Sequence, residues 1–319
     1  MSAGPQNSIR GVERMFKNLH NEAKITFWLR TAGPLLIKGP DEPGLDPLLP
    51  DMCFVRAWQN GESVPYIPGS SLKGVLRSRA EQIVRSLAPD GMEIPDPFDK
   101  QQIHDLDRLL RNKLGCEAYY ASDPLTQLFG QTYLAGRLRC SDAFPVPGKP
   151  LRMNVRNHVA INRITGASQG TALFNPEVVE EGTFEAEIGL TNFALWQLKL
   201  LGLLLQDLDE GYVFLGGGST RGYGRVRVEN VRIVLRDYRR VLPEEVLLGY
   251  HGHQEDQEKE DVVKVSGLRY SRNGFCWETT REGLAWLRDL DVDLVQELKK
   301  LHRLQSEMRQ RLERVNQGG

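Results

Sequence analysis

Apolar and polar residues alternate along several short segments of the chain, which is the pattern of a strand with one buried face. Residues 136–142 and 184–190 follow it, and residues 225–231 continue it directly after a glycine-rich stretch. Residues 25–29 are mostly β-branched or aromatic, which also favours a strand. Residues 152–175 alternate, pass through a Gly/Ser/Gln-rich turn and end on an apolar run. This last pattern predicts a protruding hairpin.

Apolar residues spaced three and four apart predict helices elsewhere. The first helix follows Pro68, and Ser70 or Ser71 can cap its N-terminus. Its expected buried face consists of Leu72, Val75, Leu76, Ala80, Ile83, Val84 and Leu87. Residues 101–113 predict a second helix and residues 194–208 a buried third one. A long amphipathic pattern from Leu287 to Val315 predicts a last helix, which either docks on a neighbouring subunit or packs on its own domain.

The order strand, helix, several strands, helix, glycine-rich loop, strand predicts an α+β fold. It is consistent with a ferredoxin-like (RRM-like) palm that carries insertions. RNA-recognition modules use the same layout. We predict one domain over residues 1–239, with the hairpin at about 150–176, and a charged linker and C-terminal helical extension over residues 240–319.

Composition narrows the setting of this 319-residue chain. No apolar run reaches the roughly 18 residues of a membrane span, and the first residues lack the apolar core of a signal peptide. We therefore expect a cytoplasmic protein with no membrane partner. The four cysteines form no closely spaced pair, which gives no zinc-ribbon or redox signature.

The charges are unevenly distributed although the net charge is only -1. Residues 63–80, 143–176 and 216–228 contain lysine or arginine and no acid. Such segregation predicts one electropositive face with a polyanion as its partner. Chance clustering on a solvated surface is the alternative.

The stretch GGGSTRGYGRVRV, residues 216–228, holds five glycines and three arginines. Glycines such as Gly217 and Gly218 let backbone amides approach a phosphate, because no Cβ stands in the way. Arg221 and Arg225 would supply charge to the same anion. The spacing of a Walker nucleotide-binding loop is absent from the sequence.

Three stretches together carry a family resemblance: YIPGSSLKGVLRS, then GRLRCSDAF with NHVAINRITG, then FLGGGSTRGYGRVRV. In this order and spacing they resemble the RAMP superfamily of CRISPR-associated proteins, over roughly residues 24–235. The strongest likeness is to the repeating backbone subunit of type III effector complexes. The resemblance implies a ferredoxin-like palm and a thumb hairpin, with copies stacked along a guide RNA. It also implies metal-dependent cutting of target RNA beside each nucleotide that a thumb displaces.

The resemblance and the residue chemistry together predict the RNA contacts. A helix N-terminus favours phosphate, and cations on the polar side of that helix would grip the backbone. Tyr223 would either stack on a base or pack, and His158 is either an RNA contact or an ordinary polar hairpin residue. The predicted RNA-binding residues are Ser70, Ser71, Lys73, Arg77, Asn157, His158, Asn162, Arg163, Gly217, Gly218, Arg221, Tyr223 and Arg225.

The cutting residue of the family is an acid in the loop after the first strand. Here that loop offers Asp41, Glu42, Asp46 and Asp51, and Asp51 directly precedes the short apolar segment 53–55, as the family acid does. We therefore predict Asp51 as the catalytic carboxylate and ligand of Mg²⁺ or Mn²⁺, with Asp46 as the second candidate. This loop is longer and richer in proline than the family's, so the absence of a competent acid stays open.

A second departure concerns zinc, because many relatives carry a histidine and clustered cysteines after the first helix. This region offers only His104 and Cys116, so we predict no structural zinc. The expected partners are guide (CRISPR) RNA, target RNA and other effector subunits. A non-catalytic guide-binding or capping scaffold is the alternative. A guide-processing endonuclease fits less well, because the chain shows one palm and no well-placed histidine.

Overall fold

The computed structural model describes residues 18–39, 50–59, 61–96, 98–111, 113, 115–164, 166, 168–238, 247–249, 262–264 and 268–317. Asp46 and most of the predicted charged linker lie outside these ranges.

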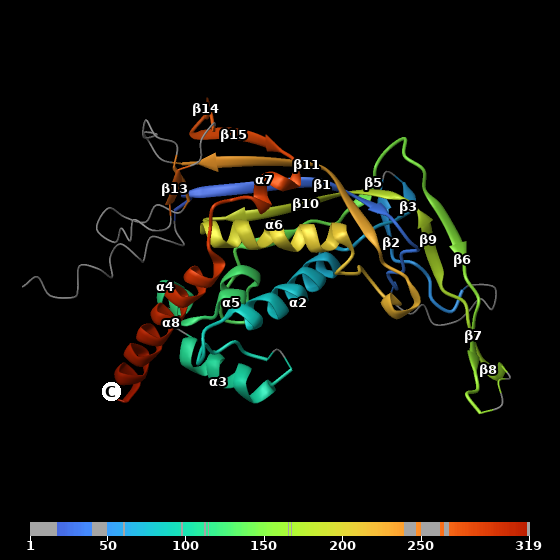
Figure 1. Cartoon of the computed structure of the whole chain (residues 1–319), viewed down its shortest axis with the longest axis horizontal. Helices are drawn as coiled ribbons and strands as arrows, with labels where there is room; N and C mark the ends of the chain where they lie inside the picture. Colours follow the sequence, from blue (N-terminus) through green and yellow to red (C-terminus); the bar gives the residue numbers. More distant parts are fainter. Residues whose placement is uncertain are drawn as a thin grey trace, which may run out of the picture.

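The centre of the molecule is a seven-stranded sheet (Figure 1). Its strand order is β14-β15-β11-β1-β10-β4, and β5 also pairs with β10. Each pairing between neighbouring strands is antiparallel. The strands are β1 (Asn21–Thr31), β4 (Leu138–Cys140), β5 (Phe144–Pro145), β10 (Thr183–Thr191), β11 (Val226–Asp237), β14 (Ser271–Asn273) and β15 (Cys276–Glu282).

The helices α2 (Gly69–Leu87) and α6 (Leu195–Glu210) cover one face of this sheet (Figure 1). Along the chain the order is β1, α2, β4, β10, α6, β11, while in the sheet it is β11-β1-β10-β4. Two strand–helix–strand units are therefore interleaved, each with a strand of the other between its own strands. The α+β class predicted from the sequence is confirmed.

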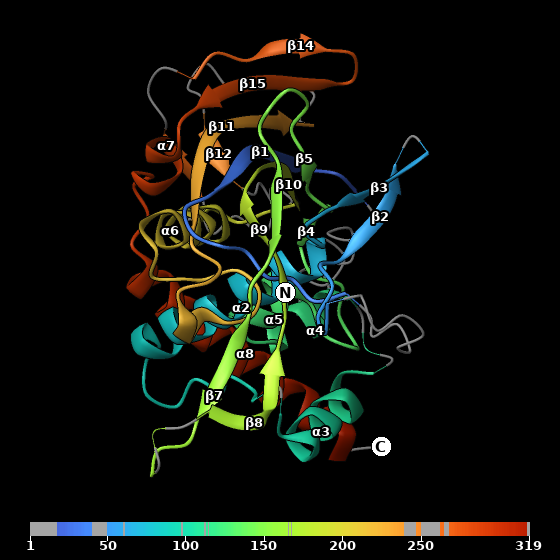
Figure 2. The ribbon, with the colours of Figure 1, turned by 90° about the vertical axis from the view of Figure 1, so that its right-hand side faces the viewer.

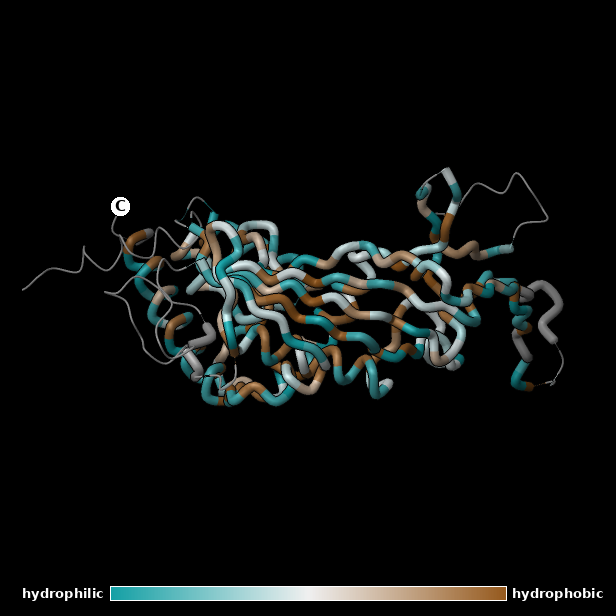
Figure 3. Tube along the Cα trace, turned by 90° about the horizontal axis from the view of Figure 1, so that it is seen from above, coloured by the Kyte–Doolittle hydropathy of each residue, from teal (hydrophilic) through white to brown (hydrophobic). Residues whose placement is uncertain are grey.

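Alternation along the strands separates the core from the opposite face. In β1 the odd-numbered residues are buried, Ile25, Phe27 and Leu29 among them, and they pack with the apolar sides of α2 and α6. Hydrophobic and hydrophilic residues alternate along the strands in Figure 3, and the more exposed residues lie on the opposite face of the sheet. This face carries cross-strand ion pairs, which join Lys24 to Glu187, Arg30 to Glu229 and Arg236 to Glu278.

The start of α2 differs from the prediction. The helix begins at Gly69, and no side chain of Ser70 or Ser71 caps it. The Gly69 N–H instead donates to Oδ1 of Asp142, 2.8 Å away. A Cβ on Gly69 would lie 2.4 Å from the carbonyl oxygen of Cys140, so only glycine fits here. The cap therefore comes from a residue far away in sequence, which a local pattern cannot reveal.

The C-terminal segment joins the same core as the palm. β15 pairs with β11, and Leu287 of α7 (Leu284–Arg288) is buried in the main core. The long helix α8 (Leu294–Gln317) packs on α2, α4 and α6, so it packs on its own chain, one of the two alternatives left open. Leu298 and Leu301 of α8 belong to the main core as well.

Smaller helices fill the space between α2 and α8. They are α3 (Lys100–Leu110), α4 (Gly115–Ala121) and α5 (Pro124–Phe129). Arg309 of α8 donates to the carbonyl of Ala121 over 2.8 Å and pairs with Glu93. Buried Asp123 caps α5, and its burial raises the pKa of that carboxyl. None of the helices in the described parts of the chain is long and apolar enough to cross a membrane.

Pairs of short strands lie outside the main sheet (Figures 1 and 2). β2 (Arg56–Gln59) pairs with β3 (Glu62–Pro65), and β12 (Leu247–Gly249) pairs with β13 (Val262–Lys264). The predicted hairpin is present and longer than expected. Its base pairs β6 (Arg152–Val155) with β9 (Glu177–Glu181), and its outer part pairs β7 (His158–Ile161) with β8 (Ser168–Phe174). We call residues 152–181 the thumb.

Gly202 marks the place where α6 and α7 approach each other most closely. A Cβ there would lie 2.8 Å from the backbone carbonyl carbon of Leu287. We expect Gly202→Ala to lower the free energy of unfolding by about 1–3 kcal/mol, because the core is overpacked. The control is Gly74→Ala in α2, where a Cβ meets nothing within 4 Å. That change should stabilise the helix by about 0.5–1 kcal/mol, and urea denaturation of both variants measures the contrast.

Candidate nucleic-acid interface

Three segments meet at one end of the palm: the loop that carries Asp51, the base of the thumb and the glycine loop, residues 211–225. The segment 34–37 lies between the last two. Leu35 exchanges two backbone hydrogen bonds with Val179 of the thumb, 2.8 and 2.9 Å long. The carbonyls of Pro34 and Leu36 accept from Gly224 and Gly217 of the glycine loop, at 2.7 and 2.8 Å. Backbone hydrogen bonds thus hold thumb and glycine loop together.

The glycines of this loop allow its backbone to pack tightly. Gly216, Gly218, Gly222 and Gly224 all have positive φ, which other residues rarely adopt. A Cβ on Gly224 would lie 2.2 Å from the carbonyl oxygen of Leu215. The glycines are therefore required by the fold of the loop itself.

The backbone amides of the loop are only partly available to an anion. The Gly217 N–H already donates to the carbonyl of Leu36, so its predicted role as a phosphate donor is not supported. The amides of Gly218, Ser219 and Thr220 have no hydrogen-bond partner among the described residues. These three consecutive amides, at the start of the short turn η1 (Ser219–Arg221), are the part that can bind phosphate.

Tyr223 packs and does not offer its ring for stacking. It is only 2% exposed and forms a small cluster with Leu36 and Val178. Of the two alternatives left open, packing therefore fits this ring better than stacking on a base. Its hydroxyl is hydrogen-bonded to Nε2 of His158 in the thumb, 2.5 Å away.

His158 is tied to neighbouring aromatic side chains. Its ring stacks on Phe174, with 5.0 Å between ring centres and 13° between planes. The guanidinium of Arg221, from the glycine loop, lies over the same Phe174 ring at 4.7 Å. His158 is half-buried in this contact, so the prediction that it binds RNA is not supported. Arg221 remains exposed beside the thumb.

The α2 group of predicted contacts lies beside residues 140–142. No hydrogen bond or ion pair among the described residues links it to the glycine loop. Ser70 is exposed, but Asp142 already accepts from the first amide of the helix, which disfavours phosphate at this N-terminus. Burial raises the pKa of the Cys140 thiol to about 12, and the positive charge of nearby Lys73 lowers it only partly.

Several arginines of the basic windows pair with acids that lie outside those windows. Arg77 pairs with Glu81 and also donates to the carbonyl of Gly130, so it is not free for RNA as predicted. Arg79 pairs with Asp207 at 2.7 Å, and Arg156 with Glu180 at 3.0 Å. The predicted cations with no acidic partner among the described residues are Lys73, Arg163, Arg221 and Arg225.

The remaining thumb candidates lie along its length. Asn157 is exposed, and Arg163 is exposed at the outer turn. Asn162 shapes that turn, since its Oδ1 accepts from the Ile164 N–H at 2.8 Å. Ile164 beside it is 95% exposed. Asn157, Arg163 and Ile164 thus present exposed side chains along the outer part of the thumb.

Asp51 is exposed at the base of the thumb. One oxygen of its carboxylate accepts from the backbone N–H of Asn175, 2.9 Å away. The other oxygen has no hydrogen-bond partner among the described residues. The adjoining residue Met52 bridges to Pro176, and its carbonyl accepts from the Glu177 N–H at 2.8 Å. The structure thus brings Asp51 next to the thumb, while Asp46 lies outside the described residues.

The groups around Asp51 fit a hard divalent cation. Its unbonded oxygen would be one ligand, and Oδ1 of Asn175, a buried atom without a hydrogen-bond partner among the described residues, would be a second. Carboxylate and amide oxygens suit Mg²⁺ and Mn²⁺. Among the described residues, no three His, Cys, Asp or Glu side chains gather into a metal-binding group. An ion at Asp51 would therefore rely on water, RNA oxygens or residues outside the described parts.

Sequence reasoning missed the residues that hold this site together. Glu177 accepts from the Phe54 N–H at 3.0 Å and pairs with Arg56 at 2.7 Å, which ties the Asp51 loop to the thumb. Phe174 and Asn175 were seen only as the end of a hairpin. An acid placed directly after the Asn-Pro at 175–176 is the one local signal that could have pointed to Glu177.

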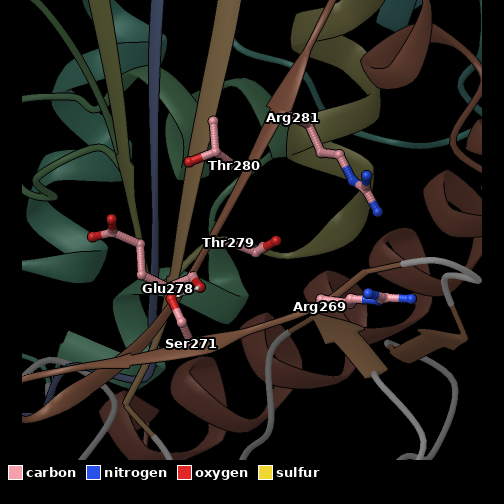
Figure 4. A pocket seen from close by; sticks show the side chains of 6 residues that line it. All are labelled: Arg269, Ser271, Glu278, Thr279, Thr280 and Arg281. Carbon is pink, nitrogen blue, oxygen red and sulfur yellow. Dashed lines mark hydrogen bonds between the residues drawn. The ribbon is translucent and has the colours of Figure 1, made fainter.

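A shallow depression lies elsewhere, on β14 and β15 (Figure 4). Arg269 and Arg281 extend to the same side of it, and Glu278 extends away. Glu278 is paired with Arg236. In Figure 1 these strands lie at the opposite end of the sheet from the thumb, so the depression is not part of the interface.

Comparisons with known proteins agree with the motifs. The family model described as the RAMP superfamily matches residues 28–227. The chain is also 28% identical, over 187 residues, to a protein of Streptococcus thermophilus described as "CRISPR system Cms endoribonuclease Csm3". That alignment covers 53% of this chain and 71% of the relative. The resemblance inferred from the sequence is confirmed, and the chain belongs to the RAMP superfamily.

Proposed function

We propose that this protein is a backbone subunit of a type III CRISPR ribonucleoprotein, which binds guide RNA and cleaves the paired target RNA. One observation carries the proposal. In a RAMP protein similar to Csm3, the thumb, the glycine loop and an exposed carboxylate meet at one end of the palm. Such a complex reads sequence by base pairing, so its protein needs only contacts to the sugar-phosphate backbone.

Guide binding would use the free cations and the free amides. The three amides of residues 218–220 and the side chain of Arg221 would hold a phosphate beside the thumb. Arg225 and Lys73 would add charge along the same RNA. The thumb would pass between nucleotides with its exposed outer turn, where Arg163 lies.

Cleavage would occur next to the thumb base. A 2'-hydroxyl of the target would attack the adjacent phosphorus, and the 5'-oxygen of the next nucleotide would leave and take a proton from water, giving a 2',3'-cyclic phosphate and a 5'-hydroxyl. Asp51 would take the proton of the attacking hydroxyl. A divalent ion held by Asp51 and the side-chain oxygen of Asn175 would supply Lewis-acid stabilisation of the phosphoryl oxygens.

RNA affinity tests the binding part. We expect the full chain to purify with RNA, seen as a high ratio of absorbance at 260 to 280 nm. The triple variant Lys73→Ala, Arg221→Ala, Arg225→Ala should bind guide RNA at least about tenfold more weakly. For this variant, the slope of log Kd against log salt concentration should be smaller by about 2 than for the parent, because three phosphate contacts are lost. Fluorescence anisotropy across a salt series measures both.

The control is Arg236→Ala, which removes a cation already paired with Glu278 on the open face of the sheet. It should bind like the parent. Equal affinity of the triple variant and the parent would place the guide on another surface.

The alternative is a guide-binding scaffold that does not cut. Only one carboxylate of the acidic loop, Asp51, lies at the site among the described residues, and the loop is longer and more proline-rich than is usual in the family. In that case the assembled complex would bind target RNA normally and leave the positions opposite this subunit uncut.

A further inference from the structure

The orientation of Asp51 depends on one contact. Its carboxylate is exposed, and within the described residues its only hydrogen bond is the one from the Asn175 N–H, at 2.9 Å. Whatever fixes the backbone at Asn175 therefore fixes the carboxylate. This argument rests on the proposed function, in which Asp51 acts on the target.

The backbone at Asn175 is held from both sides, by the contacts of Pro176 and Glu177 with Met52 and by the packing of its neighbour Phe174. The Phe174 ring contacts two side chains from other parts of the site: His158 stacks on it at 5.0 Å, and Arg221 lies over it at 4.7 Å. His158 stands on the partner strand of the thumb, directly opposite Phe174. Phe174 thus links the Asp51 contact to both the thumb and the glycine loop.

Tyr223, in the glycine loop, is the buried residue that His158 contacts on its other side. Its ring is buried against Leu36 and Val178 and packs closely on Gly218, where a Cβ would lie 2.8 Å from the ring. The single polar atom of this side chain is the hydroxyl, and it meets Nε2 of His158 at 2.5 Å. Removing that hydrogen bond would free the imidazole from the glycine loop.

We propose that His158 and Tyr223 are positioning residues for cleavage. Their hydrogen bond joins the glycine loop, which would hold the RNA phosphate, to the part of the thumb that orients Asp51. Together with the backbone hydrogen bonds through residues 34–37, it would set the distance between the bound phosphate and the carboxylate. Misplacing reacting groups by about 1 Å can lower a rate about 100-fold, so even one hydrogen bond at this place has a large effect.

Two variants remove the hydrogen bond and keep both rings. Tyr223→Phe retains the buried ring, and His158→Phe retains an aromatic partner for Phe174. We expect each, in the effector complex reconstituted with guide RNA, to lower the single-turnover rate of target cleavage at least about tenfold. The Kd for target RNA should stay within about twofold of the parent. Because both variants remove the same bond, the double variant should be no slower than either single one.

The controls separate this inference from the proposed function and from a loss of folding. Tyr238→Phe removes another tyrosine hydroxyl, bonded to Glu22 at the far end of β1, and should cleave at the parent rate. A matched Tm for all variants shows that the fold is intact. His158→Gln, which keeps a polar atom near the position of Nε2, should recover part of the rate.

The outcomes are distinct. If Asp51→Asn is inactive while Tyr223→Phe cleaves at the full rate, the positioning role is wrong and the proposed function stands. If the two single effects multiply in the double variant, the residues act separately and the proposal fails. A fully active Asp51→Asn would overturn the proposed function and this inference with it.

Discussion

Replacing Asp51 by asparagine should abolish target cleavage without disturbing the complex. Asparagine keeps the size of the side chain and an oxygen that can accept from the Asn175 N–H, but it loses the negative charge. Without that charge the side chain can neither take a proton from the attacking hydroxyl nor bind a divalent ion strongly. We expect the single-turnover rate to fall at least about 100-fold, the range for loss of a general base.

Denaturing gels of labelled target RNA measure this rate in the assembled complex, at saturating Mg²⁺ or Mn²⁺. Glu62→Gln in β3 is the matched control, since it removes an exposed carboxylate from the hairpin that follows the same loop. Guide loading and target affinity should equal those of the parent in both variants. Cleavage at every position, at the full rate, in Asp51→Asn would falsify the assignment of Asp51.

The second large effect concerns the fold of the glycine loop. Gly224 has a φ of +85°, and a Cβ there would lie 2.2 Å from the backbone oxygen of Leu215. That oxygen belongs to the backbone and has no flexible end that can yield. We expect Gly224→Ala to cost about 3 kcal/mol or more of the free energy of unfolding, because strain at positive φ adds to the clash. Guide binding should fall with it, since Gly224 also anchors the loop to Pro34.

Gly222 supplies the control within the same loop. Its φ is +81°, but a Cβ there meets nothing within 4 Å. Gly222→Ala should therefore cost only about 1–2 kcal/mol, the backbone strain alone. Urea denaturation compares the two variants. Equal losses would mean that the contact with Leu215 does not form.

The palm was predictable because its strands and helices carry their own signals. In β1 and β10 the alternation follows burial on one face, and α6 is apolar on most sides because it lies between the sheet and α7. β15 (CWETTRE) was missed, since it lies near the sheet edge and its outward residues are charged. Its pairing with β11 depends on tertiary structure, which a local pattern does not contain.

At the site, the sequence pointed to individual residues but not to the tertiary contacts that those residues make. The motifs singled out Asp51 and Arg221, and the structure places both against the thumb. Tyr223 was assigned to RNA because nothing in its neighbourhood in sequence shows that Leu36 and Val178 bury it. For the same reason, the basic windows led us to expect more unpaired arginines than the structure has. Arg79, for example, pairs with Asp207, which lies 128 residues away in sequence.

The ends of the main sheet limit how copies of this chain can associate. One edge is formed by β14, of three residues, and the other by β4 and β5, of three and two residues. β14 pairs only with residues 276–278 of β15, so the outer side of residues 279–282 is a short open edge of the described sheet. In the proposed complex, neighbouring copies would therefore contact one another mainly through side chains and hairpins. The guide RNA, and not the growth of a sheet, would then set the length of the assembly.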